Sequence, residues 1–364
     1  MSKRIIIAGG GTGGHIFPAI AIANALRKMD SNTVILFVGA KGRMEMEKVP
    51  QAGFEIKGLN ISGFNRSSLI KNIGLPFKLV RSLFQVGSIM KKFKPDAVIG
   101  VGGYSSFPVL RTAQAKGIPS YILESNSFAG KSNILLGKKA TKIFTGTTGM
   151  EKFFPAEKIM VTGNPVRESI SFSTVKRTEA EKFFSLDENK KTLLVMGGSL
   201  GAKSINEAIA GGLDEIVNKA GLRLIWQTGK NYIGVAREKT KGRSSVWVND
   251  FIGQMEFAYA AADLVVARAG AMTVAELCVA EKPVVFVPYP FAAEDHQTAN
   301  AKLLVNKQAA EMIKDSEVME KLVPAVVMLA KDESRQQELK RNIGVLAIKD
   351  ADRRIATEIM KPIQ

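Results

Sequence analysis

Four glycine-containing segments of this sequence have the composition of loops that bind phosphate groups. They lie at residues 9–14, 100–106, 197–201 and 268–273, each between an apolar run and an amphipathic run. In such a loop, backbone N–H groups and the positive end of the following helix dipole can face an anion. The same glycines can also serve only to permit a tight turn from strand to helix. The pattern favours a phosphate-bearing ligand and leaves the structural alternative open for any single loop.

The first loop, Gly9-x-Gly11-x-x-Gly14, matches the dinucleotide-binding fingerprint in form only. That fingerprint also needs an acidic residue at the end of the second strand, and residues 34–40 contain none. In the second half of the chain, Gln227 and Thr228 stand where the acid would be. Residues 130–132, Gly-Lys-Ser, lack the leading glycine of a nucleoside-triphosphate loop. A nicotinamide enzyme and an ATPase are both disfavoured.

A carboxylate for a ribose is available beside the last of the four loops. Glu276 lies one turn into the helix expected after Gly270. From that position a carboxylate can accept hydrogen bonds from both ribose hydroxyls while the first-turn N–H groups face a diphosphate. The alternative is that Glu276 only complements the helix dipole. The segment is the best candidate for a nucleotide-binding site.

The residues around these loops predict an α/β fold with parallel, doubly wound sheets. Short apolar strands are expected at residues 4–8, 33–38, 96–99, 120–123, 142–144, 192–196, 223–226, 264–267 and 283–287. Between them, apolar residues recur every three or four positions, as at Ile16, Ile20, Ala23 and Leu26, which is typical of helices. Right-handed βαβ units are therefore expected.

An internal repeat predicts two domains of the same type. The apolar run and glycine loop at residues 5–14 recur in outline at residues 193–201. Two Rossmann-like domains in tandem, facing each other across a cleft, are expected. Because Pro165 restricts the residue before it to extended backbone, we expect domains at 1–164 and 165–345. A C-terminal helix at 346–364 could return to either domain, and we assign it to the first.

The composition excludes several classes of protein. The 364 residues include 51 Lys and Arg against 34 Asp and Glu, a net charge of +17, and 46% are hydrophobic, which is a globular balance. A single cysteine, Cys278, cannot form an internal disulfide, and with two histidines it cannot build a zinc site. No run approaches the ~20 apolar residues that a spanning helix needs. A cytoplasmic protein without a signal sequence is expected.

A basic, apolar stretch at residues 56–95 contains no Asp or Glu. Its positive residues are Lys57, Arg66, Lys71, Lys78, Arg81, Lys91, Lys92 and Lys94. Leu75, Leu79 and Leu83 recur at helical spacing, flanked by Phe77, Val80 and Phe84, beside a polar stripe that includes Lys78 and Arg81. We expect an interfacial helix on an anionic membrane surface; the alternative is a packed helix with a basic outer face. The aromatic content of 7% and the absence of an RNA-binding signature argue against nucleic acid as a partner.

Together these motifs resemble the MurG family of transferases, which add N-acetylglucosamine to the lipid-linked muramyl-peptide precursor of peptidoglycan. The resemblance runs from Ile5 to about Asn300. Its motifs are GGTGGH at 10–15 followed by Pro18, GGY at 102–104, Glu124-x-Asn126, GNPVR at 163–167, GGS at 197–199, residues 268–276 and Asp295-x-Gln297. The resemblance implies a GT-B fold, UDP-N-acetylglucosamine as donor held mainly by the C-terminal domain, an undecaprenyl-diphosphate-linked muramyl peptide as acceptor, and no cofactor.

The resemblance also implies which residues bind the donor. Contacts to the sugar or its phosphates are expected from Thr12, Gly13, Gly14, Asn126 and Gln297, and contacts to the diphosphate from Arg167 and Ser199. Ile252 is expected to meet the uracil through its backbone. Phosphate and ribose are expected at Ala271, Met272, Thr273, Val274, Ala275 and Glu276. Leu123 stands where the family often has a histidine, so no histidine can act from that position.

An inverting displacement needs a base near the acceptor's 4-hydroxyl and positive potential at the departing diphosphate. His15 is the first candidate for the base, because it ends the first glycine loop and histidine has an ordinary pKa of ~6.5. Equally open is a role in capping the helix or binding a phosphate. Glu124 is the second candidate, with a local structural hydrogen bond as its alternative. Asp295 and His296 are assigned no catalytic role, because Asp is a common helix N-cap.

No metal is expected. The one Asp-x-Asp sequence, at residues 350–352, lies within the C-terminal helical pattern rather than at the end of a strand. We expect helix dipoles and Arg167 to stabilise the leaving group instead.

We therefore expect an inverting, metal-independent hexosyltransferase that converts lipid I to lipid II and binds peripherally to the cytoplasmic face of the membrane. Two alternatives remain open. One is a related GT-B transferase that uses a UDP-sugar on another lipid, such as a diacylglycerol. The other is a basic protein that holds nucleotide sugar or nucleic acid without chemistry.

Overall fold

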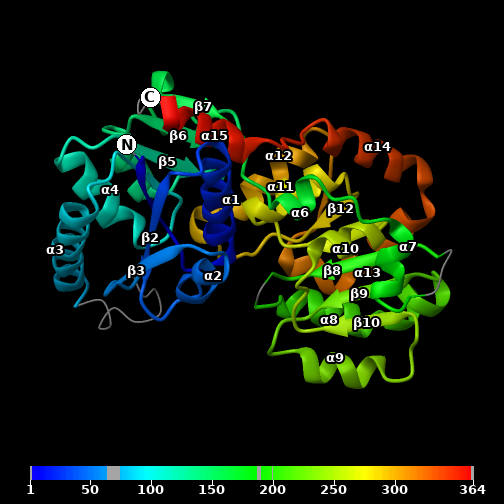
Figure 1. The fold of residues 1–364 in the computed structure, drawn as a ribbon. Coiled ribbons are helices and arrows are strands. Elements are labelled where there is room, and N and C mark those ends of the chain that lie inside the picture. The colour runs from blue at the N-terminus through cyan, green and yellow to red at the C-terminus, as the bar shows by residue number, and fades with distance from the viewer. Residues whose placement is uncertain (1, 64–73, 187–189, 199, 362–364) are drawn as a thin grey trace. The chain divides into compact units, whose positions relative to one another are not determined.

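The computed structural model describes residues 2–63, 74–186, 190–198 and 200–361. The chain forms two compact units (Figure 1), Met1–Arg167 with Asp350–Gln364 and Glu168–Lys349, which we call unit 1 and unit 2. The chain passes from unit 1 to unit 2 after Arg167, on the loop where the sequence analysis places a boundary at 164. It returns to unit 1 after Lys349, so the C-terminal helix belongs to unit 1.

Unit 1 is built on a parallel sheet of seven strands in the order β3-β2-β1-β4-β5-β6-β7. The strands are β1 (Arg4–Ala8), β2 (Val34–Ala40), β3 (Glu55–Leu59), β4 (Ala97–Gly100), β5 (Ser120–Glu124), β6 (Lys142–Thr145) and β7 (Ile159–Val161). Its helices are α1 (Gly13–Met29), α2 (Glu45–Gln51), α3 (Leu75–Phe93), α4 (Ser106–Ala115), α5 (Lys131–Gly137), the 3-10 turn η2 (Ala156–Lys158) and α15 (Ala351–Met360).

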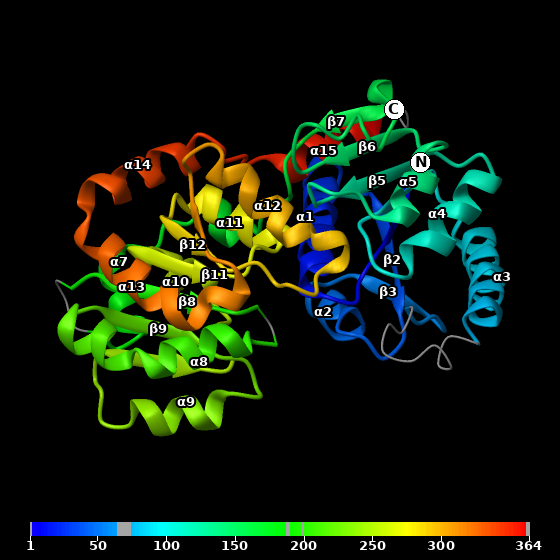
Figure 2. The ribbon, with the colours of Figure 1, turned by 180° about the vertical axis from the view of Figure 1, so that it is seen from behind.

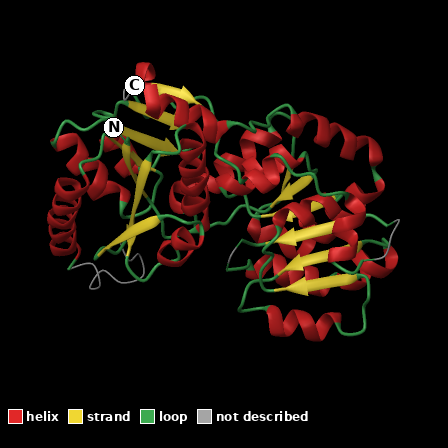
Figure 3. Ribbon diagram, viewed as in Figure 1, coloured by secondary structure: helices red, strands yellow, loops and turns green. Residues whose placement is uncertain are grey.

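Helices cover both faces of this sheet, as the ribbon coloured by secondary structure shows (Figure 3). Ile5 and Ile7 point to one face, where α1 and α15 pack together and bury Ile355 and Ile359. Ile6 points to the other face, toward α3 and α4. Because β1 is buried on both sides, its sequence is a continuous apolar run rather than an alternating one.

Unit 2, which Figure 2 shows from behind, repeats this plan. Its parallel sheet has six strands in the order β10-β9-β8-β11-β12-β13. The strands are β8 (Thr192–Met196), β9 (Arg223–Gln227), β10 (Val246–Asn249), β11 (Leu264–Ala267), β12 (Val284–Phe286) and β13 (Glu311–Met312). The helices are α6 (Glu168–Ser171), α7 (Arg177–Phe183), α8 (Lys203–Gly211), the π-helical turn η3 (Asp214–Lys219), α9 (Ile233–Thr240), α10 (Met255–Ala261), α11 (Ala271–Ala280), the 3-10 turn η4 (Ala293–Asp295), α12 (His296–Val305), the 3-10 turn η5 (Asp315–Glu317), α13 (Val318–Lys331) and α14 (Glu333–Gly344).

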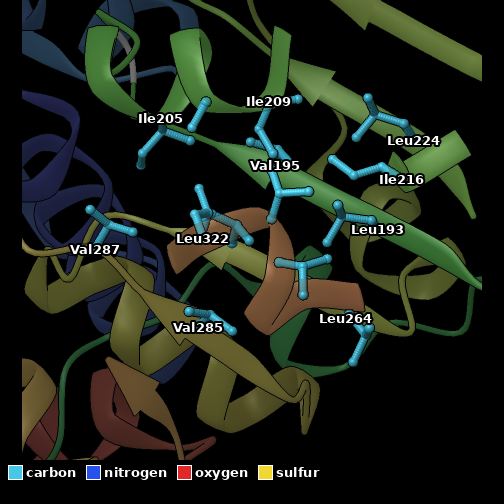
Figure 4. Packing of buried hydrophobic residues seen from close by; sticks show 14 of the residues in the cluster. Leu193, Val195, Ile205, Ile209, Ile216, Leu224, Leu264, Val285, Val287 and Leu322 are labelled. Atoms are coloured by element: carbon cyan, nitrogen blue, oxygen red, sulfur yellow. The ribbon is translucent and has the colours of Figure 1, made fainter. Parts of the chain in front are cut away.

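The core of unit 2 lies between its central strands and the helices α8 and α13 (Figure 4). Leu193 and Val195 of β8 meet Ile205 and Ile209 of α8 and Leu322 of α13, and all five side chains are fully buried. This packing fixes the end of β8, from which the glycine loop of unit 2 departs.

Both sheets have the strand order of a doubly wound fold, which confirms the predicted fold class. The first strand of each unit, β1 or β8, lies beside the fourth, β4 or β11, and the chain winds outward from this pair in both directions. Ligands of such sheets bind at the carboxyl ends of the strands where the order reverses. All four glycine-containing loops of the sequence analysis follow these strands, so the fold places two of them side by side in each unit.

Candidate active site

The two glycine loops of unit 1 interlock at the carboxyl edge of the sheet. The backbone N–H of Gly10 donates to the carbonyl of Gly102 at 3.3 Å. A Cβ atom on Gly103, whose φ is +85°, would lie 2.3 Å from the carbonyl oxygen of Gly10. The Ser106 hydroxyl, at the start of α4, donates a hydrogen bond to the carbonyl of Ala8 at 2.9 Å, which joins the second loop to the end of β1. Glycine is therefore required here because two backbones touch.

Thr12, Gly13, Gly14 and His15 lie together at the start of α1, which follows the first of these loops. Thr12 is the N-cap and has extended backbone, and α1 begins at Gly13. The first-turn N–H groups of a helix have no partner within the helix, which makes its start suited to an anion. The structure thus groups these four predicted site residues at one helix terminus.

His15 has a defined orientation on this loop. Its Nδ1 lies 3.1 Å from the carbonyl oxygen of Gly10 and 3.5 Å from the Thr12 hydroxyl. A carbonyl oxygen can only accept, so Nδ1 carries the hydrogen in the neutral imidazole and the lone pair is on Nε2. A side chain at Gly102 would place its Cβ 2.7 Å from Nε2, so glycine leaves room for this nitrogen. The arrangement is suited to a general base.

Glu124, the second candidate base, is occupied by its own loop. It is buried, and Oε1 accepts hydrogen bonds from the backbone and side-chain nitrogens of Asn126 at 3.1 and 3.4 Å. Oε2 accepts from the Gly130 N–H at 3.0 Å and from the Asn133 amide at 2.8 Å. The geometry favours the structural alternative: Glu124 orients Asn126 and the start of α5.

Arg167 and the preceding GNPV segment lie near the same edge of unit 1. The buried Asn164 amide donates to the carbonyl of Ser125 at 2.9 Å, which joins this segment to the loop after β5. The Arg167 guanidinium lies over the Phe17 ring of α1, 4.8 Å from its centroid. Arg167 therefore places a positive charge against α1, and the N-terminus of this helix is a candidate anion site.

The glycine loop of unit 2, residues 197–201, is fixed by the last residue of β9 and the loop that follows it. The Gln227 side-chain amide donates to the carbonyl of Gly198 at 3.0 Å. Gly201 has a φ of +77°, and a Cβ there would lie 2.0 Å from the carbonyl oxygen of Thr228. Ser199, predicted to contact the diphosphate, lies outside the described residues.

Glu276 is the acidic residue of unit 2 that the sequence analysis proposes for binding a ribose. It lies on α11, which begins at Ala271 after an extended N-cap, Gly270, and it is 9% exposed. Its Oε2 accepts a hydrogen bond from the Tyr259 hydroxyl of α10 at 3.0 Å. The half-buried residues Ala271, Met272, Thr273, Val274 and Ala275 form the first turns of the same helix. The sequence analysis does not identify Tyr259, because it lies on another helix, α10, and its distance from Glu276 in the sequence forms no recognisable motif.

Arg268 anchors the loop that leads into α11. Its guanidinium donates to Asp315 at 2.6 Å, to the carbonyls of Val287 and Pro288 at 3.1 Å, and to the Ser204 hydroxyl at 3.1 Å. On the other side of the loop, the buried Asn300 amide donates to the carbonyl of Ala269 at 3.1 Å. Charge-assisted hydrogen bonds to several elements hold the start of α11 in place.

Gln297 and Ile252 lie on two further segments of unit 2, which follow β12 and β10 in the chain. Gln297, in the first turn of α12, accepts a hydrogen bond from the Tyr289 N–H at 2.9 Å. Ile252, in the loop after β10, is 2% exposed. Asp295 stands at the N-cap of α12, and its carboxylate accepts from the Thr298 hydroxyl at 2.6 Å.

A network of charged residues with shifted pKa values lies before the strands β8, β11 and β12 of unit 2. Burial lowers the pKa of Lys282 to about 8, against the opposing effect of Asp263. Burial raises the pKa of Asp263, but hydrogen bonds from Arg177 and from the Thr192 N–H outweigh it, so the net shift is downward. Arg177 reaches both oxygens of Asp263, at 2.6 and 2.8 Å. This network holds α7 against the sheet and has a structural role.

The structure shows which apolar residues of α3 face the solvent. Leu75, Leu79 and Leu83 are half-buried, because they lie beside the face of α3 that packs on α4 and β3. Phe77, Val80 and Phe84 are 80%, 52% and 77% exposed. They form a shallow hollow together with Pro76 and Arg81, and Lys78 is exposed beside them.

The described part of the chain contains no helix that is both long enough and apolar enough to cross a membrane. Within the same residues, no cluster of three or more His, Cys, Asp or Glu side chains could hold a metal ion. Lys57, Lys91, Lys92 and Lys94 of the basic stretch are described, whereas Arg66 and Lys71 lie outside the described residues.

Comparison with known proteins gives matches along nearly the whole chain. Residues 5–145 match the N-terminal domain of glycosyltransferase family 28, and residues 192–355 match its C-terminal domain. A protein of Parabacteroides distasonis named UDP-N-acetylglucosamine--N-acetylmuramyl-(pentapeptide) pyrophosphoryl-undecaprenol N-acetylglucosamine transferase is 51% identical over 99% of this chain and 98% of the relative. A protein of Flavobacterium psychrophilum with the same name is 46% identical over 99% of this chain and 98% of its own length.

Solved structures give the same picture. The crystal structure of Acinetobacter baumannii MurG has a TM-score of 0.79 and 29% identity, and the match covers 99% of both chains. UDP-GlcNAc 2-epimerase from Neisseria meningitidis, solved with UDP-GlcNAc bound, has a TM-score of 0.70 and covers 99% of this chain and all of its own. Its identity of 16% supports a shared fold alone.

Proposed function

This chain belongs to glycosyltransferase family 28, and from that premise we propose that it transfers N-acetylglucosamine from UDP-N-acetylglucosamine to the 4-hydroxyl of a lipid-linked N-acetylmuramyl peptide. The observation that supports this most directly is the identity of 51% over 99% of the chain to a transferase with that printed activity. The reaction is the lipid I to lipid II step of peptidoglycan synthesis.

In this proposal, unit 2 binds the nucleotide part of the donor. The Glu276 carboxylate, oriented by the Tyr259 hydroxyl, accepts hydrogen bonds from the ribose hydroxyls. The N–H groups at the start of α11 face the diphosphate, and the backbone of Ile252 meets the uracil. Gln297 and, from unit 1, Thr12, Gly13, Gly14 and Asn126 contact the sugar or its phosphates, as the family resemblance implies.

His15 is the general base of this mechanism. The acceptor's 4-hydroxyl gives its proton to Nε2 while its oxygen attacks the anomeric carbon from the face opposite UDP. The bond between the anomeric carbon and the diphosphate oxygen breaks in the same displacement, so the configuration inverts. Helix N-termini and Arg167 stabilise the charge that develops on the diphosphate. We propose that no divalent cation takes part, because no Asp-x-Asp sequence follows a strand.

We propose that α3 binds the membrane surface in which the acceptor is anchored. The exposed Phe77, Val80 and Phe84 supply an apolar face, and Lys78 and Arg81 beside them supply positive charge. Basic residues near an anionic leaflet contribute about 1 kcal/mol each. The enzyme is then a peripheral protein of the cytoplasmic face, where the nucleotide donor is available.

The test is an assay with radiolabelled UDP-N-acetylglucosamine, a soluble analogue of the muramyl lipid and excess chelator. Labelled disaccharide product is expected, and chelator should not reduce its rate. Transfer to a diacylglycerol with none to the muramyl lipid would replace the acceptor and support the related lipid transferase. Measurable binding of UDP without label in any lipid would exclude catalysis and support a binding protein.

A further inference from the structure

Glu45 is a buried carboxylate for which the mechanism above has no use. It begins α2 and is 1% exposed. Its Oε2 accepts a hydrogen bond from the Gly11 N–H at 2.7 Å, and its Oε1 accepts one from the Ala40 N–H at 2.9 Å. Burying a carboxylate is costly unless hydrogen bonds replace its water. Glu45 thus joins the end of β2 to the first glycine loop.

The backbone around Glu45 is shaped to admit its carboxylate. A Cβ on Gly10 would lie 2.2 Å from the Glu45 carboxyl carbon, and a Cβ on Gly39 would lie 2.5 Å from Glu45 Cγ. Any side chain at either glycine would displace the acid. Two glycines, Gly10 in the first glycine loop and Gly39 near the end of β2, therefore leave the space that this one carboxylate fills.

The peptide group between Gly10 and Gly11 connects Glu45 to His15. Its N–H, which belongs to Gly11, donates to Glu45, and its carbonyl, which belongs to Gly10, accepts from His15 Nδ1 at 3.1 Å. A peptide group is planar and conjugated, so a charge acting on its N–H increases the electron density on its carbonyl oxygen. The carboxylate and the imidazole are therefore the two ends of one hydrogen-bonded chain.

We propose that Glu45 is a positioning residue that acts on His15 through the Gly10–Gly11 peptide. The ionised carboxylate makes the Gly10 carbonyl a stronger acceptor, which holds the hydrogen on Nδ1 and makes Nε2 the basic nitrogen. When Nε2 takes the proton of the acceptor hydroxyl, the imidazolium is stabilised, while Glu45 stays ionised and the Nδ1 hydrogen stays in place. This inference rests on the proposed function, in which His15 is the base.

The direct test is an NMR titration of His15 in the Glu45→Gln variant. The chain has only two histidines, so a His296→Gln background identifies the His15 signals. Loss of the negative charge should lower the pKa of His15 by about 0.5 to 1 unit and increase the fraction of the other tautomer. Glu47→Gln, the same change at an exposed position of α2, should leave both unchanged. A folded Glu45→Gln protein with an unaltered His15 titration would overturn the proposal.

Turnover gives a second measurement. In Glu45→Gln the acid limb of the pH profile of kcat should move to lower pH, and kcat on the plateau should fall about tenfold, with the KM for donor unchanged. A purely structural brace would change the yield of folded protein or both kinetic constants, without moving the limb. An unmoved limb, with kcat lowered and the KM for donor raised, would therefore exclude the proposal.

A measurement on the wild-type protein covers the case in which Glu45→Gln fails to fold. The amide proton of Gly11, seen in a sample labelled with ¹⁵N-glycine, should shift with the same midpoint as His15, because both use one peptide group. A chemical shift of the Gly11 amide proton that does not change while His15 titrates would overturn the proposal. None of the NMR measurements needs turnover, so a chain that transfers no sugar would refute the proposed function while this coupling could still be observed.

Discussion

The glycine loops at 9–14 and 197–201 leave the first strand of each unit at the same position in the strand order, but they are fixed by opposite chemistry. In unit 1 the brace is a carboxylate, Glu45, which accepts the N–H of Gly11. In unit 2 the brace is an amide, Gln227, which donates to the carbonyl of Gly198. The same turn is thus stabilised once by engaging a backbone donor and once by engaging a backbone acceptor.

This difference explains how one repeated motif can serve two purposes. The loop of unit 1 uses an N–H group on a buried negative charge and turns the Gly10 carbonyl toward His15, which suits proton transfer. The loop of unit 2 is held by an amide rather than a carboxylate, and a neutral brace suits a loop beside an anionic diphosphate. The repeated fold does not distinguish the two loops. The side chain that braces each loop, Glu45 or Gln227, does.

The largest effect that would separate the two loops is expected from His15→Ala. Removing a general base should lower kcat about 10² to 10⁴-fold with the dissociation constant for UDP-N-acetylglucosamine unchanged. Steady-state kinetics and calorimetric titration of the donor measure the two quantities. Equal losses in turnover and in donor affinity would instead identify His15 as a phosphate contact.

Alanine at one glycine of each unit is the next sharpest comparison. A Cβ at Gly103 would meet the Gly10 carbonyl, and a Cβ at Gly201 would meet the Thr228 carbonyl. Displacing a loop by ~1 Å can cost about a hundredfold: Gly103→Ala should lose turnover, and Gly201→Ala should lose donor affinity. Gly117→Ala and Gly242→Ala are matched controls, since both have positive φ but open space at Cβ. If both test variants lost the same kinetic constant, the division of labour would be wrong.

Glu276→Ala tests the nucleotide grip of unit 2 alone. The loss of charge-assisted hydrogen bonds to the ribose should weaken donor binding by about 1.5 to 3 kcal/mol, and Tyr259→Phe should weaken it by about 0.5 to 1.5 kcal/mol. Isothermal titration with UDP gives both values. Unchanged affinity in Glu276→Ala would remove this residue from the site.

Charge reversal on α3 tests a property confined to unit 1. Lys78→Glu with Arg81→Glu should release the protein from vesicles that contain anionic lipid, by about 1 kcal/mol or more for each residue. Turnover of a soluble acceptor should not change. Lys239→Glu with Lys241→Glu makes the same change of net charge at exposed positions of unit 2 and should leave vesicle binding much less affected. Sedimentation that is equal for both double variants would refute the α3 surface.

The last prediction concerns the stability of unit 2 and leaves the site unchanged. Burial lowers the pKa of Lys282 to about 8 from 10.5, so between these values the folded chain binds fewer protons than the unfolded chain. The free energy of unfolding should therefore rise with pH across this window. In Lys282→Met this rise should be reduced, while donor affinity stays the same. Urea denaturation at pH 8 and pH 10 measures the change in the free energy of unfolding between these pH values. The same change in the wild type and in Lys282→Met would contradict a lowered pKa of Lys282.

The sequence predicts the central strands of both sheets and misses the edges, for a physical reason. β1 and β8 are buried on both faces, so their residues form uninterrupted apolar runs. The four strands without a prediction are β3, β7, β10 and β13, which are the outer strands of the two sheets. Each keeps partly exposed residues, so its sequence does not differ enough from a loop.

The candidate site divides in the same way. Glycine loops and the acid at Glu276 could be found because their chemistry is local in the sequence. Glu45 and Tyr259 could not, because each meets its partner only through tertiary packing. On α3 the sequence predicts the helical period, but it does not single out Phe77, Val80 and Phe84 as the exposed apolar residues, since apolar residues occur on both sides of that helix and periodicity does not say which side packs.

The position of α15 in unit 1 bears on the biogenesis of this protein. Ile355 and Ile359 complete the core around α1, yet they emerge from the ribosome only after all of unit 2. Unit 2 is continuous in the chain, so it can reach its native state during translation, whereas unit 1 must wait for the final helix. A nascent chain arrested before residue 350 would expose the apolar side of α1, the helix whose first turn holds His15, and would be a substrate for chaperones.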